Sequence, residues 1–284
     1  SSTSISYGSK IVYNSAQSYF NSVVFDPNTA NKLVIAYRNV EVGTAIVGTV
    51  SSNSISFGTP SVFETPTGGN YIEIAYDPNT ANKFVIVHAD EGNSNYGTAI
   101  VGTVSSTSIS FGSPVVFNSG NTTATSIGLS FDKNTATKFV IAYKDTSNST
   151  YITVIEGTLG STSVTFGSEI VTNSAASDYP DMAFDPSSYG KFVVVYRNAG
   201  NSNYGTSIVG QVSGTSISFG TEVIFNSGYT SEPAMAFDPN NANKFVVVYR
   251  NDSTSDRGET IVGTVSGTSI SYGSVVVFNS ASVN

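Results

Sequence analysis

The chain has 284 residues and a net charge of −8, and only 11% of its residues are charged, against roughly 25% in an average soluble domain. So few lysines and arginines disfavour nucleic-acid binding, which depends on clustered positive charge. The lack of cysteine excludes disulfides, thiolate metal sites and cysteine nucleophiles, and no apolar run reaches the roughly 18 to 20 residues of a membrane-spanning helix.

An internal repeat organises the chain. A phrase of the type SISFG occurs six times, and its copies end at glycines spaced by 50, 54, 55, 53 and 53 residues. Periods of this length are typical of propeller blades and kelch-type repeats. We therefore divide the single domain 1–284 into five repeats, approximately 9–58, 59–112, 113–167, 168–220 and 221–273.

Each repeat predicts four strands, which are clearest in the fifth copy. Residues 233–237 form a short apolar stretch that enters Asp238-Pro239, a pair that suits a type I turn. Residues 244–250 are a continuous β-branched and aromatic run, as expected for a strand that is buried on both faces. The third strand, 260–265, has Gly263 in its middle, and a glycine recurs there in all five copies, which indicates close packing against a neighbouring sheet.

The fourth strand is the SISFG phrase itself, and no segment of the chain has a helical period. The fold class is therefore all-β. Small sheets buried on both faces need neighbours in front and behind, which radial stacking provides. We expect a five-bladed β-propeller with four antiparallel strands per blade.

The copy number of the fourth strand predicts how the ring closes. First, second and third strands occur five times, whereas the fourth-strand phrase is duplicated at the two ends of the chain, within 1–8 and 269–284. One terminal copy should complete the last blade, so that the ring is closed by terminal strand exchange. The other copy then lies along the outer edge or reflects excision from a longer array, and the sequence leaves open which copy closes the ring.

The repeat resembles known proteins. The run GTAIVGTVSSTSISFGSPVVFNS at residues 97–119 is similar to repeats of propeller-like proteins in tailed bacteriophage virions, especially those of marine bacteria. The resemblance covers essentially the whole chain and implies a virion or extracellular protein that contacts host surfaces or other virion proteins. More distantly, residues 213–220 resemble the S-x-D-x-G-x-x-W box of sialidase-like propellers, but they lack the Asp and have Phe in place of Trp.

Catalytic candidates are few. The single histidine, His88, replaces a tyrosine of the other copies, so we interpret it as a packing residue without the partners that a triad or metal site needs. Glu156 replaces a valine, which predicts either an open face or a buried partner. We expect no enzyme activity, metal or cofactor. The acids outside the repeated turns, which alone offer a glycosidase pair, are Asp90, Glu91, Asp178, Asp181 and Glu232.

Binding candidates follow the second strand. Four cations share one repeat position, where they either form a site for an anion or acidic sugar or pair with local acids. Three tyrosines follow at matching positions, where they either stack on sugar rings or pack between blades. These candidates are Arg38, Lys144, Arg197, Arg250, Tyr96, Tyr151 and Tyr204.

The loops beside these candidates vary most among the copies and are rich in Asn, Asp, Ser and Tyr, which suits glycan binding. We expect a non-catalytic structural or adhesive module, monomeric and without a nucleic-acid partner, that binds host-surface glycans through its rim loops. The alternatives are a glycoside-processing enzyme of the sialidase-like type and a scaffold without a ligand.

Overall fold

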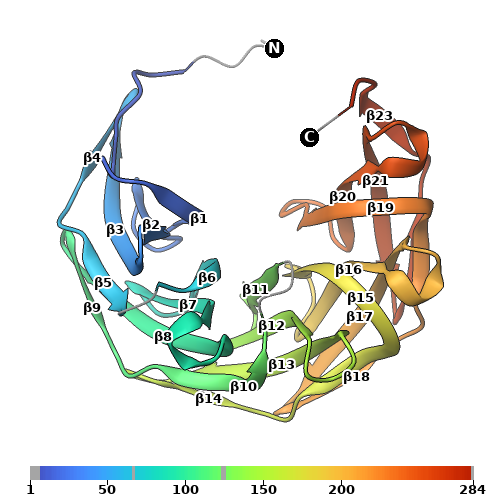
Figure 1. Ribbon diagram of the computed structural model, residues 1–284, viewed down its shortest axis with the longest axis horizontal. Coiled ribbons are helices and arrows are strands. Elements are labelled where there is room, and N and C mark those ends of the chain that lie inside the picture. The colour runs from blue at the N-terminus through green and yellow to red at the C-terminus, as the bar shows by residue number, and fades with distance from the viewer. Residues whose placement is uncertain (1–6, 66–67, 123–125, 283–284) are drawn as a thin grey trace.

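The structure is a computed structural model that describes residues 7–65, 68–122 and 126–282. These residues form antiparallel strands and three short 3-10 turns, and the described part of the chain contains no α-helix. The strands are grouped in four-stranded units, here called blades, which are arranged side by side along an open arc (Figure 1). The all-β class predicted from the sequence is confirmed.

The first blade shows the plan of the others. Strands β1 (Ser18–Phe25), β2 (Lys32–Asn39) and β3 (Val42–Ser51) are paired in this order. The fourth strand comes in two pieces, β4 (Ser54–Phe57) and β5 (Ser61–Glu64), which both pair with β3. Each predicted repeat boundary therefore falls between the two pieces of a fourth strand.

The other blades repeat this order. The second contains β6 (Asn70–Tyr76), β7 (Lys83–Asp90), β8 (Tyr96–Ser105), β9 (Ser108–Phe111) and β10 (Val115–Asn121), and the third contains β11 (Ile127–Phe131), β12 (Lys138–Asp145), β13 (Tyr151–Leu159) and β14 (Val164–Phe166). The fourth contains β16 (Lys191–Asn198), β17 (Tyr204–Ser213) and β18 (Ser216–Phe219), and the fifth β20 (Lys244–Asn251), β21 (Arg257–Ser266), β22 (Ser269–Tyr272) and β23 (Val276–Asn279).

Two long strands link the later blades. β15 (Ile170–Phe184) and β19 (Val223–Phe237) each begin as the fourth strand of one blade and end as the first strand of the next. The 3-10 turns η1 (Glu91–Asn93), η2 (Ala199–Asn201) and η3 (Asp252–Thr254) follow second strands. They lie in the loops that vary most among the copies.

Apolar faces hold neighbouring blades together. On one face, here called the trailing face, second- and third-strand residues such as Val34 and Val47 point toward the following blade. On the opposite, leading face, first-strand residues such as Ile74 and Tyr76 pack against the preceding blade. These side chains form one buried cluster, so each interface is stabilised by removal of apolar surface from water.

The third-strand glycines are close-packed, but against their own sheet. Gly210 pairs with Phe192 of the adjacent strand, and a Cβ atom on Gly210 would lie 2.1 Å from Cζ of that ring. The prediction that a neighbouring sheet needs the space was wrong, because the cross-strand phenyl ring fills it.

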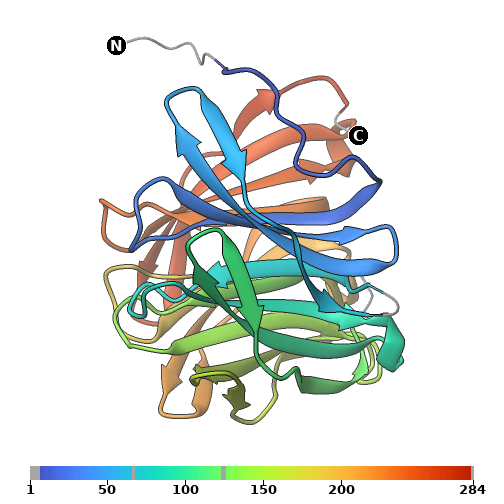
Figure 2. The ribbon, with the colours of Figure 1, turned by 90° about the vertical axis from the view of Figure 1, so that its left-hand side faces the viewer.

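Strand exchange is not what the structure shows at the ends of the arc. The last blade is completed by its own β22 and β23, which pair with β21, so the edge that a terminal strand would fill is occupied. The N-terminal segment instead runs beside the first blade (Figure 2), where the Tyr13 ring centroid lies 5.1 Å from that of Tyr37. Residues 4–6 of the N-terminal phrase lie outside the described residues.

Candidate functional site

The four predicted cations lie at the ends of second strands, and we call Arg38, Lys144, Arg197 and Arg250 the cation rim. Two of them clearly span a junction between blades. Arg38 donates from Nη1 to Oδ1 of Asn70 in the next blade at 2.5 Å, and Lys144 pairs with Asp178 of the blade that follows it. Part of the rim therefore lies at blade junctions, whereas Arg250, in the last blade, pairs within its own loop.

Arg197 is held between aromatic rings. Its guanidinium carbon lies 4.8 Å from the ring centroid of Tyr179 and 5.1 Å from that of Tyr229, within cation–π range. The guanidinium also pairs with Asp178 and donates to the Tyr229 hydroxyl at 3.0 Å. This arginine thus holds together two tyrosines from opposite edges of the fourth blade, one in its first strand and one in its fourth strand, just before β19 passes to the fifth blade.

Each cation of the rim has a carboxylate partner. Burial alone would raise the pKa of Asp178, but hydrogen bonds and charges from Lys144 and Arg197 hold that pKa below its usual value. Arg38 pairs with Glu91 at 3.0 Å, and Arg250 pairs with Asp252 at 2.7 Å. An anionic ligand would have to compete with these acids, so the rim suits a neutral ligand better than the acidic sugar considered from the sequence.

A cavity of about 310 Å³ opens at the junction between the first two blades. Its lining combines two aromatic rings, Tyr19 and Phe20, with polar groups of Arg38, Glu41 and Asn70. Of these residues, only Arg38 was a candidate from the sequence. A cavity with aromatic walls and a few convergent polar groups is the usual form of a small-ligand site.

Phe20, one of the two aromatic residues that the sequence did not single out, lies at a β-bulge. The pairing of β1 with β2 shifts between Tyr19 and Ser22, and Phe20 within the bulge has φ = 50°, a conformation rare for a bulky residue. Tyr71 and Tyr179 have φ = 52° and 54° in the corresponding bulges. An aromatic residue six positions before the Asp of the repeated turn is the signal in the sequence that would have found them.

The three predicted tyrosines lie one strand further from the centre. Tyr96, Tyr151 and Tyr204 begin β8, β13 and β17 and are half-buried. Tyr204 is the cross-strand partner of Tyr229, whose ring contacts Arg197. Only in this blade do the described contacts link a predicted tyrosine to a predicted cation.

A second cavity, of about 420 Å³, lies between first strands of different blades and is lined by Glu73, Asp181 and Glu232. Burial raises the pKa of Glu73 to about 7, although a hydrogen bond from Ser22 opposes the shift. Burial also raises the pKa of Asp181 to about 6, although that carboxylate accepts from the backbone N–H of Met235 at 2.7 Å. Carboxyl groups with raised pKa values in a cavity are candidates for proton transfer.

The remaining sequence candidates have structural roles. Asp90 caps η1 by accepting from the Asn93 N–H. His88 is fully buried, with Nε2 3.9 Å from Oε2 of Glu64, and burial lowers its pKa to about 4, so it is neutral at pH 7. Within the described residues no group of three or more potential metal ligands occurs, and no helix long and apolar enough to cross a membrane.

Glu156 is paired, so the open-face alternative was wrong. It is buried and accepts from Nζ of Lys138 at 2.6 Å within the third blade. The equivalent lysines Lys32 and Lys83 instead donate to carbonyls of Ser106 and Ser161 in the turn of the next blade.

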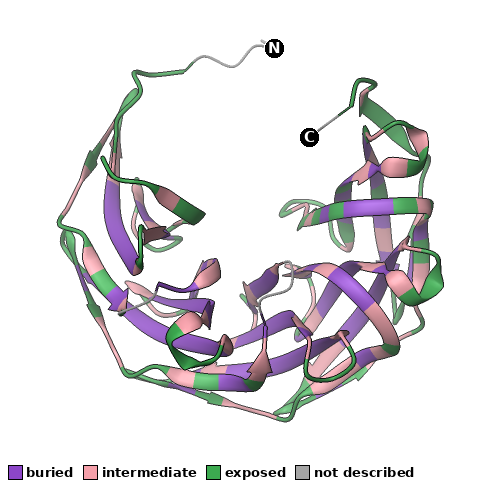
Figure 3. Ribbon diagram, viewed as in Figure 1, coloured by how far each residue is buried: buried purple, intermediate pink, exposed green. Residues whose placement is uncertain are grey.

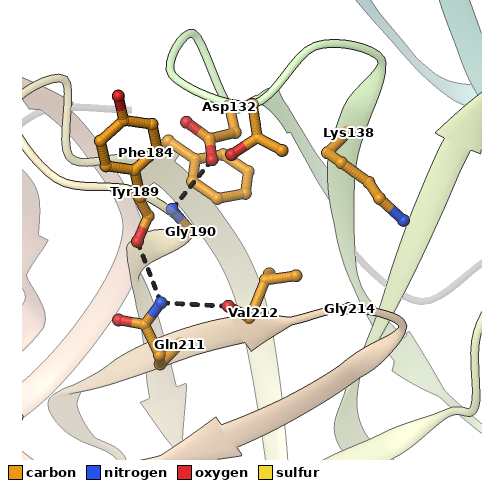
Figure 4. A pocket seen from close by; sticks show the side chains of 9 residues that line it. Asp132, Lys138, Phe184, Tyr189, Gly190, Gln211, Val212 and Gly214 are labelled. Carbon is orange, nitrogen blue, oxygen red and sulfur yellow. Dashed lines mark hydrogen bonds between the residues drawn. The ribbon is translucent and has the colours of Figure 1, made fainter.

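Lys138, which bonds within its own blade instead of to the next one, lies beside a cavity. Gly214 is the residue of the fourth blade that corresponds to those turn serines, and Lys138 and Gly214 both line a cavity of about 230 Å³. Figure 4 shows this cavity with the hydrogen bonds that frame it, from Gly190 to Asp132 and from Gln211 to the Tyr189 carbonyl. The cavity therefore opens at a junction that lacks the interblade lysine bond.

No protein-family model and no curated protein matches the sequence. Solved structures do match. The BP39L lectin from Burkholderia pseudomallei is 12% identical with a TM-score of 0.65, over 90% of this chain and 69% of that chain.

A 6-phosphogluconolactonase-like protein from Bacteroides fragilis is 7% identical with a TM-score of 0.63, over 90% of this chain and 70% of that chain. The NanB sialidase from Streptococcus pneumoniae is 13% identical with a TM-score of 0.52, and the match covers 83% of this chain and 39% of the sialidase chain. At these identities the likeness concerns the fold alone. The chain has a β-propeller fold, which lectins and enzymes share.

Proposed function

We propose that this protein is a non-catalytic adhesive module whose five blades bind neutral sugar residues of surface glycans at their junctions. The observation that carries the proposal is the cavity lined by Tyr19, Phe20, Arg38 and Asn70. Its rings offer apolar faces for a sugar ring, and its guanidinium and amide groups offer hydrogen bonds to hydroxyls. The similar fold of the BP39L lectin supports the proposal.

The repeated rim favours multivalent binding. Three of the four cations lie in blades that another blade follows, whereas Arg250 lies in the last blade and the second blade has Ala89 instead, so several weak sites face one rim. A surface that carries many glycans can engage these sites together and thereby gain avidity over a single site. A virion or extracellular setting, with host glycans or other virion proteins as partners, is the part of the proposal that comes from the resemblance of the repeats.

Binding of neutral oligosaccharides tests the proposal. We expect the protein to bind members of a glycan array, with free-sugar affinities measured by titration calorimetry. Asn70→Ala should weaken the affinity on the order of tenfold, about 1.4 kcal/mol, because the hydrogen-bond partner of Arg38 is lost. Lys133→Ala, in an exposed turn, is the matched control and should bind like the wild type.

A second candidate function rests on the acidic cavity. Glu73 and Asp181 have raised pKa values there, as a general acid requires, and the NanB sialidase shares the fold. A hydrolysis screen with aryl glycosides separates the two functions. If the protein hydrolyses an aryl glycoside and Asp181→Asn abolishes that hydrolysis, the protein is an enzyme and the binding proposal falls. If neither binding nor hydrolysis is detected, the protein is a scaffold without a ligand.

A further inference from the structure

The cavity between the third and fourth blades is built by residues that depart from the repeat. Tyr189 replaces an alanine of the other four copies, Gly190 replaces an asparagine or threonine, and Gln211 replaces a threonine. All three line the cavity. Glu156, which replaces a valine, holds Lys138, and that lysine lines the cavity as well. Because the copies otherwise agree closely, departures that converge on one place indicate a local role beyond folding.

This cavity lies away from the cation rim. β12 runs from Lys138 at the cavity to Lys144 at the rim, so the two sites are at opposite ends of the second strands. The strands β12 and β13 on one side and β16 and β17 on the other are buried along most of their length (Figure 3). Packed blades therefore fix the walls of the cavity.

Hydrogen bonds fix the frame of the cavity within the fourth blade. Gln211 donates from Nε2 to the carbonyls of Tyr189 at 3.0 Å and of Val212 at 3.1 Å. Gly190 permits this close approach, because a Cβ atom there would lie 2.7 Å from the Val212 carbonyl oxygen. The walls are thus in place before a ligand arrives, which reduces the entropic cost of binding.

The first two junctions show which chemical group this part of a blade accepts. Lys32 of the first blade donates its ammonium group to the Ser106 carbonyl in the turn of the second blade. Lys83 of the second blade donates in the same way to the Ser161 carbonyl of the third. The turn between the third and fourth strands therefore serves as an acceptor for an ammonium group from the preceding blade.

At the third junction this acceptor is left to another donor. Lys138 is held within its own blade by Glu156, 2.6 Å away. Gly214 takes the place of the two turn serines, and no hydrogen bond among the described residues reaches its carbonyl. Lys138 and Gly214 both line the cavity, so the cavity offers an ammonium acceptor that the chain's own lysine does not use.

We propose that this cavity binds a small organic ligand with a primary ammonium group, which donates to the Gly214 carbonyl in place of the lysine. Phe184 and Val212 line the cavity and provide apolar walls for the carbon skeleton of the ligand. Tyr189 also lines it, is 74% exposed, and offers a ring face within reach of a bound cation.

The charges around the cavity favour a cation. The ammonium group of Lys138 is paired with the buried Glu156, so its repulsion of a second cation is largely cancelled. The lining also includes the carboxylate of Asp132, and the chain as a whole carries a net charge of −8. Figure 4 shows Lys138 on the opposite side of the cavity from Gln211 and Tyr189.

Competition by the protein's own lysine tests the proposal. Glu156→Val restores the residue of the other copies and frees Lys138 to bond to the Gly214 carbonyl. Titration calorimetry should show that n-butylammonium binds to the wild type and at least tenfold more weakly to this variant. Glu156→Val combined with Lys138→Met removes the competing lysine without changing the net charge, and should recover most of the affinity. Circular dichroism melting checks that both variants fold.

The controls separate competition by lysine from a change of charge. Asp256→Asn removes one carboxylate in the fifth blade, outside the cavity, and should bind like the wild type. Tyr189→Ala should weaken binding about two- to fivefold, because the ring face is lost. n-Butanol, which has the same chain without the ammonium group, should not bind.

A second pair of probes distinguishes the sources of the ammonium group. Preferential binding of glucosamine over glucose would support an amino sugar as the ligand, and binding of n-butylammonium alone would support an acyclic amine. The proposal would be overturned if neither amine bound to the wild type at tens of millimolar, or if n-butanol bound as tightly as n-butylammonium. It would also be overturned if the double variant bound no better than Glu156→Val.

Discussion

At the residue scale, the third-strand glycines are the positions that tolerate least change. A Cβ atom at Gly102, Gly157, Gly210 or Gly263 would lie 2.1 or 2.2 Å from a phenylalanine ring carbon of the adjacent strand. The ring is fully buried and cannot move without displacing the core between blades. We expect Gly210→Ala to destabilise the protein by about 1–3 kcal/mol, measured by urea unfolding.

The control is a glycine outside the strands with free space around it, Gly273, which follows the end of β22. Gly273 has a single neighbour within 4 Å of its ideal Cβ among the described residues, the Val262 carbonyl at 3.8 Å. Gly273→Ala should leave the free energy of unfolding nearly unchanged. Gly200, which the sequence presents as an ordinary loop glycine, is no control, since its ideal Cβ lies 2.7 Å from that of Ala175. Equal losses at Gly210 and Gly273 would contradict the role of the phenylalanine ring.

At the element scale, the junction between the third and fourth blades can be tested through its ion pair. Removal of Lys138 leaves the Glu156 carboxylate buried without a cation, which typically costs 3–5 kcal/mol. Removal of Glu156 leaves a lysine that is partly exposed and can reach the turn at Gly214, as its equivalents do. We therefore expect Lys138→Met to lower the melting temperature strongly and Glu156→Val to leave it unchanged or raise it.

Lys83→Met is the matched control, because that lysine bonds only to a turn carbonyl in the described contacts. We expect this substitution to lower the melting temperature only slightly. If Lys138→Met behaves like Lys83→Met, the buried carboxylate does not depend on its lysine, and the account of this junction fails.

The strands of a blade could be predicted because their signals are local. The run at residues 244–250 and the turn at Asp238-Pro239 lie within one repeat, and the structure places β20 and its preceding turn there. The bulge at Phe20 was missed, because its only local trace is an aromatic residue six positions before the turn Asp, whereas its positive φ arises where the pairing of β1 with β2 shifts. For this reason Arg38 was predicted from the sequence and the aromatic walls beside it were not.

At the scale of the whole molecule, the repeat count does not determine closure. The angle between blades depends on the side chains that fill each interface, and an internal repeat does not reveal that angle. The structure therefore agrees with the stacking of blades but leaves the first and last blades apart (Figure 1). What links distant blades within one chain is the acidic cavity, where Glu73 of the second blade and Asp181 of the fourth interact electrostatically.

This cavity makes the stability of the whole molecule depend on pH. The pKa of Glu73 is about 7 in the folded protein because of burial, against an ordinary value of 4.5. Between these values the folded protein keeps a proton that the unfolded chain has released, so this contribution to the free energy of unfolding falls as pH rises. The contribution of Asp181 to the free energy of unfolding also falls as pH rises, up to about pH 6. The contribution of His88, whose pKa is lowered to about 4, rises with pH instead.

Comparison of Glu73→Gln with the wild type isolates the Glu73 contribution, since the other groups are present in both proteins. At pH 4 the two should be about equally stable, because Glu73 is then largely protonated in both the folded and the unfolded protein and resembles the amide. At pH 8 the variant should be more stable, by up to about 1.4 kcal/mol per unit of the pKa shift, as urea unfolding at both pH values would measure. Glu232→Gln, an exposed position at the same cavity, is the control and should change little. A stability difference for Glu73→Gln that is the same at pH 4 and pH 8 would mean that folding does not raise the pKa of this carboxyl.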